Sequence, residues 1–367
     1  MESKFCKALL ASLFCSLASA ASLGSGPVKF EYGGDFDFLL DNLEESARFW
    51  PTRTLFSGKL SPEIGFSFYN QRVMLGGYFI LNMGDRYPQQ GGLSLYYEVL
   101  YKDIKALFGI FPRKQWTIYD GGALKYSRLF FREDFLFNNP FSSGILFQYS
   151  PKRLGLTTEL LFDWYGGNLK KRIDEFFVQG LVRKGFFNEL LFIGGAFLLY
   201  HSKNEELLNA DGNNFDTYLL DRIYYEVFIG SELASVIPYI ESMQFKFSNL
   251  SSLERKRRLS TGLDPASNLI GWQFDFGIRY KGFGIDNSLY FGNNQYKYFM
   301  EYGEAFYSGL PFYQSSLYDR LEVYYEYRNS YFRGRIGAIF HFTKEGFSHQ
   351  QMLTISLDSS RLFGHGS

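Results

Sequence analysis

The stretch that decides the fold is YDRLEVYYEYRNSYFRGRIGAIFHFT, which spans residues 318–343. In its first half, Leu321, Val323 and Tyr325 alternate with polar or charged neighbours. Alternation with a period of two residues is typical of a β-strand with one apolar face, whereas a helix would place the same charges on that face. Asn329 and Ser330 between the two halves are typical of a tight turn. The stretch is therefore predicted to form a β-hairpin.

The same alternation recurs along most of the chain. We count about 16 alternating segments, with an error of about two. They lie near 27–40, 61–70, 72–82, 92–101, 103–111, 143–150, 153–164, 174–183, 186–201, 221–232, 238–248, 268–280, 283–292, 318–328, 331–343 and 351–363. Short turns alternate strictly with longer polar links, of which 112–142 is the longest and 344–350 is the last. This order predicts one domain of up-and-down hairpins.

The overall composition excludes two large classes of protein. The 367 residues include 38 basic and 38 acidic side chains, so the net charge does not favour a protein that binds nucleic acid through its phosphates. A hydrophobic content of 46% excludes a disordered chain. Aromatic residues make up 20%, more than a soluble core needs, and we expect most of these rings on an apolar outer surface.

The first twenty residues have the features of a secretory signal peptide. Two lysines precede an apolar run at 8–17, and Ala18, Ser19 and Ala20 supply the small residues that a signal peptidase accepts. We predict that residues 1–20 are removed, together with both cysteines of the chain. Residues 21–367 then form a single domain without thiolate ligands, and we expect no metal and no cofactor.

The strand lengths favour a barrel that crosses a membrane. Segments of about ten to thirteen residues exceed the five or six of soluble sheets and match the span of a tilted transmembrane strand. In lipid, such a sheet must close so that every backbone group is paired. We therefore predict an all-β fold, a transmembrane antiparallel up-and-down β-barrel of about 16 strands, with a range of 14–18. Aromatic residues at the ends of the apolar stripes are expected to form interfacial girdles: Tyr69, Tyr101, Tyr149, Trp164, Tyr200, Tyr280, Tyr327, Phe342 and Phe363.

This spacing of strands and loops resembles the porins of the bacterial outer membrane over residues 21–367. Locally, Gly109, Phe111 and Pro112 look like the Gly-x-Phe…Pro element that precedes the third external loop of phosphate-selective porins. The resemblance implies an outer-membrane location and a segment 112–142 that folds inward as a constriction loop. It also implies lipid, lipopolysaccharide and the barrel assembly machinery as partners, and a homo-oligomer. Porins usually end on an aromatic residue, a role that Phe363 can take.

The residues opposite the apolar stripes are the candidates to line a water-filled pore. They are Lys105, Glu159, Glu189, Arg222, Glu226, Lys246, Asp275, Arg279, Arg320, Glu322, Glu326, Arg328, Arg333 and Arg335. The constriction-loop candidates are Arg113, Lys114, Lys125, Arg128, Arg132, Glu133 and Asp134. Neighbouring arginines on two adjacent strands would make one wall basic and give a slight anion preference. Opposite-sign neighbours such as Arg320 and Glu322 favour the alternative of paired charges without selectivity.

The function that these patterns favour is passive or weakly selective diffusion of small hydrophilic solutes through a channel. The alternative is a non-channel barrel that acts as an adhesin or handles polysaccharide through its external loops. We expect no enzyme, because neither His201 nor His341 lies in a recognisable nucleophile pattern. The basic run 254–258, placed in an external loop, would either bind lipopolysaccharide or remain a solvated charge run.

Overall fold

The computed structural model describes residues 28–46, 49–117, 126–166, 174–203, 217–234, 236–258 and 262–358. The predicted signal peptide and Phe363 lie outside these residues. No helix in the described ranges is both long and apolar enough to cross a membrane.

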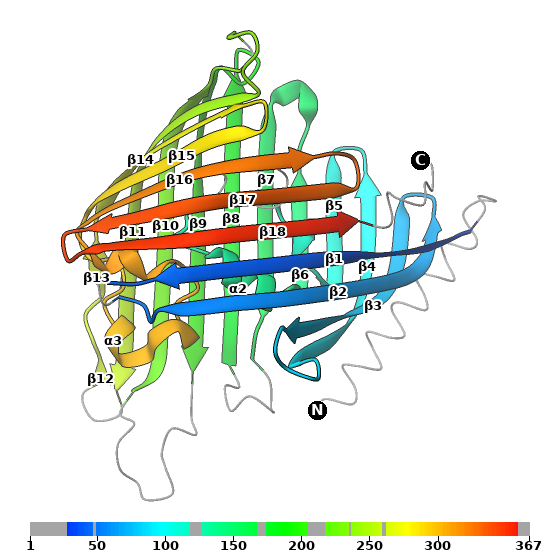
Figure 1. Ribbon diagram of the computed structural model, residues 1–367. Helices are drawn as coiled ribbons and strands as arrows, with labels where there is room; N and C mark the ends of the chain where they lie inside the picture. The colour runs from blue at the N-terminus through cyan, green and yellow to red at the C-terminus, as the bar shows by residue number, and fades with distance from the viewer. Residues whose placement is uncertain are drawn as a thin grey trace, which may run out of the picture.

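The strands form one closed antiparallel sheet, in which each long strand pairs with the next along the chain (Figure 1). The first eight long strands are β1 (Lys29–Glu44), β2 (Arg53–Phe68), β3 (Gln71–Asn82), β4 (Gln90–Tyr101), β5 (Ile104–Pro112), β6 (Phe141–Tyr149), β7 (Leu156–Trp164) and β8 (Asp174–Phe186). The other eight are β9 (Leu191–Lys203), β10 (Thr217–Glu232), β11 (Ser242–Arg258), β14 (Gly271–Tyr280), β15 (Phe283–Gly292), β16 (Leu317–Arg328), β17 (Phe332–Thr343) and β18 (Phe347–Asp358). Pairing of β1 with β18 closes the barrel.

The alternation seen in the sequence becomes the two faces of the barrel wall. In β16, Val323 and Tyr325 are exposed on the outside, whereas Arg320 and Glu322 are buried inside. Two short strands, β12 (Gly262–Leu263) and β13 (Ser267–Leu269), only extend the edge of β11. The prediction of an all-β up-and-down barrel with 16 long strands is confirmed.

Several predicted boundaries are wrong, because a polar side chain inside a wet barrel does not end a strand. β11 continues to Arg258 through what was predicted to be an external loop. β18 begins at Phe347, so the last external connection has only residues 344–346. Conversely, the turn between β10 and β11 covers 233–241. Short and long connections therefore do not alternate strictly.

Two long connections turn into the barrel. The first inner loop, of which the structure describes 113–117 and 126–140, follows the nine-residue strand β5. Because β5 is much shorter than the sixteen-residue β1 and β2, the loop leaves the wall before its outer rim. The second inner loop, 293–316, connects β15 and β16. Near the end of β5, Gly109 has φ 116°, and a Cβ there would lie 2.4 Å from the carbonyl oxygen of Leu95, so the position requires glycine.

Contacts of helix α2 (Glu133–Asn138) show that the first inner loop lies inside the barrel. Asp134 contacts Arg53 of β2 at 2.9 Å, and Glu133 lies 3.8 Å from Arg320 of β16. The Phe135 ring lies 6.5 Å from that of Phe177 on β8. The side chains of one short helix thus contact three separated parts of the wall. Figure 1 shows α2 between the front and rear strands of the barrel. The described parts of segment 112–142 therefore fold inward.

Candidate functional site

The two inner loops are bonded into a single unit. Their backbones pair where the amide of Arg132 donates to the carbonyl of Ser308 and the amide of Leu310 donates to the carbonyl of Arg128, both at 2.9 Å. The hydroxyl of Tyr296 adds a bond to the carbonyl of Leu129 at 2.9 Å. Because these bonds satisfy backbone groups deep inside the barrel, neither loop can leave without exposing the other.

Arg132 is the polar joint of this unit. Its guanidinium donates to the carbonyl oxygen of Tyr307 at 2.6 Å and to the carboxylates of Asp134 and Glu304. Glu304 also accepts a bond at 2.5 Å from the indole nitrogen of Trp50, in the connection between β1 and β2. Arg132 and Glu304 therefore attach both inner loops to the connection between β1 and β2.

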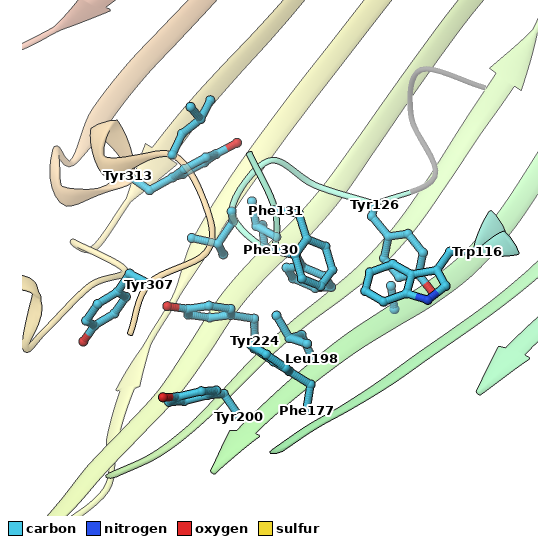
Figure 2. Packing of buried hydrophobic residues seen from close by; sticks show 14 of the residues in the cluster. Trp116, Tyr126, Phe130, Phe131, Phe177, Leu198, Tyr200, Tyr224, Tyr307 and Tyr313 are labelled. Atoms are coloured by element: carbon cyan, nitrogen blue, oxygen red, sulfur yellow. The ribbon is translucent and has the colours of Figure 1, made fainter. Parts of the chain in front are cut away.

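An aromatic cluster fills the space between the inner loops and one side of the wall (Figure 2). Phe130 stacks over Tyr224 of β10 with ring centres 6.0 Å apart. Tyr296 lies 4.8 Å from Tyr307 within the second inner loop. Buried rings of this size each remove about 150–250 Å² from water. The expectation that the rings lie mainly outside is therefore wrong in part, since many form an internal core.

Beneath this cluster the wall is dry. Its charged side chains are at most 2% exposed, and most are paired: Lys246 lies 2.7 Å from Glu226 and 3.3 Å from Asp275. Arg320 lies 2.9 Å from Glu322. We call this surface the dry wall, defined by Asp163, Arg222, Glu226, Lys246, Asp275, Arg320 and Glu322.

Arg222 of the dry wall is held by aromatic faces. Its guanidinium lies 4.3–5.0 Å from the ring centres of Tyr200, Tyr224 and Tyr307. Tyr307 in turn donates to the carboxylate of Glu254 at 3.0 Å. Cation–π contacts gain strength when they are desolvated, so this arginine helps to anchor the second inner loop. The buried position of Tyr200 also contradicts its prediction as a girdle residue.

The opposite side of the interior is wet. There Arg72 is 43% exposed, Lys114 is 35% exposed and Asp37 is 23% exposed, although all three lie inside the closed sheet. We call this surface the wet wall, defined by residues of β1, β2, β3 and the first inner loop: Glu31, Asp35, Asp37, Lys59, Glu63, Arg72 and Lys114. Accessible charges inside a barrel indicate a water-filled space.

Lys114 carries the first inner loop across the interior to the wet wall. Its ammonium pairs with Asp35 of β1 and lies 3.6 Å from Glu63 of β2. Burial alone would lower the pKa of Lys114, but the two carboxylates outweigh that effect and raise the pKa. The lysine therefore remains charged at neutral pH.

The predicted pore-lining residues fall into three groups. Those of the dry wall, together with Glu159, face inward but are covered by the inner loops. A second group lies on the less covered side of the interior, where Lys105, Arg279, Arg333 and Arg335 remain partly exposed and Glu326 is buried beneath its arginines. Arg328 is exposed at the turn end of β16, and Glu189 is partly exposed in the turn after β8. The predicted pore-lining residues are thus covered by the inner loops on one side of the interior and partly exposed on the other.

The predicted basic wall is neutralised by its neighbours. Arg335 lies 2.6 Å from Glu322 and 3.0 Å from Asp286. Glu326 accepts from Arg333 at 2.8 Å and from Arg279 at 2.9 Å. These arginines therefore contribute little net positive potential.

The constriction-loop candidates behave as a group. Arg113, Lys114, Arg128, Arg132, Glu133 and Asp134 all make ion pairs inside the barrel, whereas Lys125 lies outside the described residues. Burial alone would raise the pKa of Glu133, but Arg128 and Arg320 outweigh it and hold the pKa below its ordinary value.

The second inner loop and the acids of β1 were missed by the sequence reasoning. A signal for the loop was present, because 293–316 contains many tyrosines and phenylalanines that an external polar loop does not need. The acids of β1 recur at every second or fourth position from Glu31 to Asp41. The strand was predicted from the apolar face opposite them, and the acids themselves were not proposed to line the pore.

A cavity of about 180 Å³ lies between the joined inner loops and strands β8 and β9. Its polar lining includes Arg132, Asp134, Glu175 and Glu304, and its rings include Phe177 and Phe306. The volume is small compared with pockets for drug-sized ligands, which begin at about 300 Å³.

The basic run 254–258 belongs to β11, so its placement in an external loop is wrong. Strand alternation divides the run: Glu254 and Lys256 are buried inside, whereas Arg255 and Arg257 are exposed. Arg255 donates to Asp221 at 2.9 Å, and Asp221 also lies 2.7 Å from His201. Within the described ranges, no serine hydroxyl is bonded to this histidine.

A closed barrel of sixteen long antiparallel strands with loops folded inside defines the class of porin-type β-barrels. OprB of Pseudomonas putida is similar in structure, with a TM-score of 0.52 at 11% identity over 90% of this chain and 94% of that chain. A mutant of the Rh. blastica porin aligns over 90% and 100% of the two chains, with a TM-score of 0.48 at 11% identity. No protein-family model and no curated relative matches the sequence. At this identity, the likeness to OprB shows a shared fold.

Proposed function

We propose that the protein is an outer-membrane porin, a water-filled channel for passive or weakly selective diffusion of small hydrophilic solutes. The observation that carries this proposal is the wet wall, whose charges remain exposed inside a closed barrel. Lipid outside and packed loops on one side leave this wall as the hydrophilic route through the structure. The apolar outer surface supports the membrane location.

In this proposal the first inner loop is the constriction. Lys114 bridges it to the wet wall, and the pairing with the second inner loop fixes its position. The paired state of Arg333 and Arg335 supports weak selectivity rather than the slight anion preference predicted from the arginines alone.

Lipopolysaccharide is the proposed partner at the outer end of β11. Arg255 and Arg257 are exposed there, at the end of the barrel that carries the long connections, and phosphate groups are suitable ligands for arginine. A homo-oligomer and recognition by the barrel assembly machinery follow from the same proposal. No catalytic role is proposed.

The adhesin or polysaccharide-handling alternative required either an outward segment 112–142 or a plugged interior. The described parts of the segment fold inward, which removes the first condition. The inner loops packed on the dry wall favour a plugged interior, whereas the exposed charges of the wet wall oppose it.

Conductance separates the two functions. Purified protein in a planar lipid bilayer is expected to give stepwise, ohmic current increments in potassium chloride. A heat-denatured sample is the control for detergent artefacts. Folded protein that inserts without producing any current steps contradicts the porin proposal and favours the plugged barrel.

A further inference from the structure

We infer that the channel prefers cations, and that Asp35 and Asp37 of β1 are the residues that determine this preference. The inference rests on the proposed channel function and specifies its solutes as small cations. It reverses the slight anion preference that the sequence predicts.

The charges of the wet wall are unequal in number. Each of its three cations is shared or matched by carboxylates: Lys114 faces Asp35 and Glu63, and Lys59 lies 3.1 Å from Asp37. Arg72 lies 3.3 Å from Glu31 and 3.8 Å from the buried carboxylate of Glu98. The four carboxylates of the wet wall and the buried one of Glu98 on β4 therefore share three cations, which leaves a net negative surface.

The neighbouring strand carries a further carboxylate beside Asp35. Asp358 of β18 lies opposite Asp35 in the register of the two strands and is partly exposed. On the other side of β18, the four arginines Arg279, Arg320, Arg333 and Arg335 contact four carboxylates, of Glu241, Asp286, Glu322 and Glu326. These paired residues leave no basic surplus to offset the acids of β1.

The cavity beside the inner loops is also lined by acidic groups. The carboxylates of Asp134, Glu175 and Glu304 line it together with the guanidinium of Arg132. The ring of Phe177 also lines this cavity. Ring faces carry partial negative charge and attract cations, so the cavity opposes anions as the wet wall does.

The physical effect follows from charge on a narrow, low-dielectric wall. Fixed charges of one sign along such a wall raise the local concentration of the opposite mobile ion and repel the like one. Asp35 and Asp37 are the best placed to act, because they lie near the middle of β1 where Lys114 brings the constriction to the wall.

The test is the reversal potential of single channels in a potassium chloride gradient at low ionic strength. The wild-type protein is expected to give a potassium-to-chloride permeability ratio of about three or more. The double variant Asp35→Asn/Asp37→Asn, which changes charge with little change in shape, should lower that ratio at least about twofold. Asp35→Glu/Asp37→Glu should restore it, and Asp85→Asn, on an exposed external connection, should leave it unchanged.

Each result has a distinct meaning. A wild-type ratio of one or below overturns the cation preference while leaving the channel intact. A high ratio that the asparagine variant does not lower overturns the assignment to Asp35 and Asp37. Folded protein without current steps removes the porin proposal itself, and the inference with it. Heat-dependent gel mobility confirms that each variant is folded.

Discussion

The dry wall and the wet wall are built from the same alternating strands but differ in what covers them. On the dry wall, Lys246 and its two carboxylates are at most 2% exposed beneath the aromatic cluster. On the wet wall, Lys59 and Asp37 form a similar pair in contact with water. Coverage by a loop, and not strand sequence, decides whether an inward charge is packed away from water or stays in contact with it.

The two walls should also differ in how much their ion pairs contribute to stability. A buried ion pair recovers its desolvation cost only while every partner is present, whereas an exposed pair contributes little either way. The dry wall is therefore expected to be intolerant of substitution, and the wet wall free to vary.

The largest expected effect separates the two walls directly. Lys246→Met leaves Glu226 and Asp275 buried without their cation and should destabilise the barrel by about 3–5 kcal/mol. Arg72→Met, at a wet-wall side chain that is 43% exposed, should cost less than about 1 kcal/mol. Urea unfolding in detergent micelles measures both, and equal losses would contradict the distinction between the walls.

A smaller effect is expected at Arg132, which bonds the two inner loops to each other above the dry wall. Arg132→Ala removes the bonds to Tyr307, Asp134 and Glu304, so the inner loops should loosen over the dry wall. We expect single-channel conductance to rise by roughly twofold, with more frequent fluctuations between levels. Arg132→Lys keeps the charge without the forked geometry and should give an intermediate result. An unchanged conductance in both variants would show that the loops do not limit the channel.

The hydrogen bond between Tyr296 and Leu129, which joins the two inner loops, can be removed by itself. Tyr296→Phe leaves the buried carbonyl of Leu129 without this donor and should cost about 1–2 kcal/mol. Tyr327→Phe, on the exposed outer surface, should cost nearly nothing. The two variants differ from wild type by the same single oxygen, so urea unfolding isolates the value of the bond.

The smallest effect on stability is expected outside both walls. Arg255→Ala/Arg257→Ala should change unfolding by less than about 0.5 kcal/mol and leave conductance unchanged, yet weaken binding of lipopolysaccharide severalfold. Lys297→Ala, exposed in the second inner loop, is the matched control. Equal binding by the double variant and wild type would show that these arginines are ordinary solvated charges without a role in binding lipopolysaccharide.

The barrel itself could be predicted because its signal is local. Each strand pair, such as β16 with β17, has its alternation and its turn within a few residues, and a membrane sheet must close. The inward course of the first inner loop followed from a resemblance. The dry wall could not be predicted, since it depends on contacts such as that of Arg222 with Tyr307, which lies 85 positions further along the chain.

The pairing of the inner loops has a consequence for the order of assembly. Arg132 and Tyr307 are 175 positions apart, and the second inner loop reaches its place only when β15 and β16 join the sheet. Until then, we expect the apolar rings of the first inner loop to lie against an open sheet, without the rings of the second inner loop to pack on them. Contacts this distant in sequence form late, so closing the wall and filling the interior should be one concerted step. A chain stalled before β16 would present those rings to any chaperone in the periplasm.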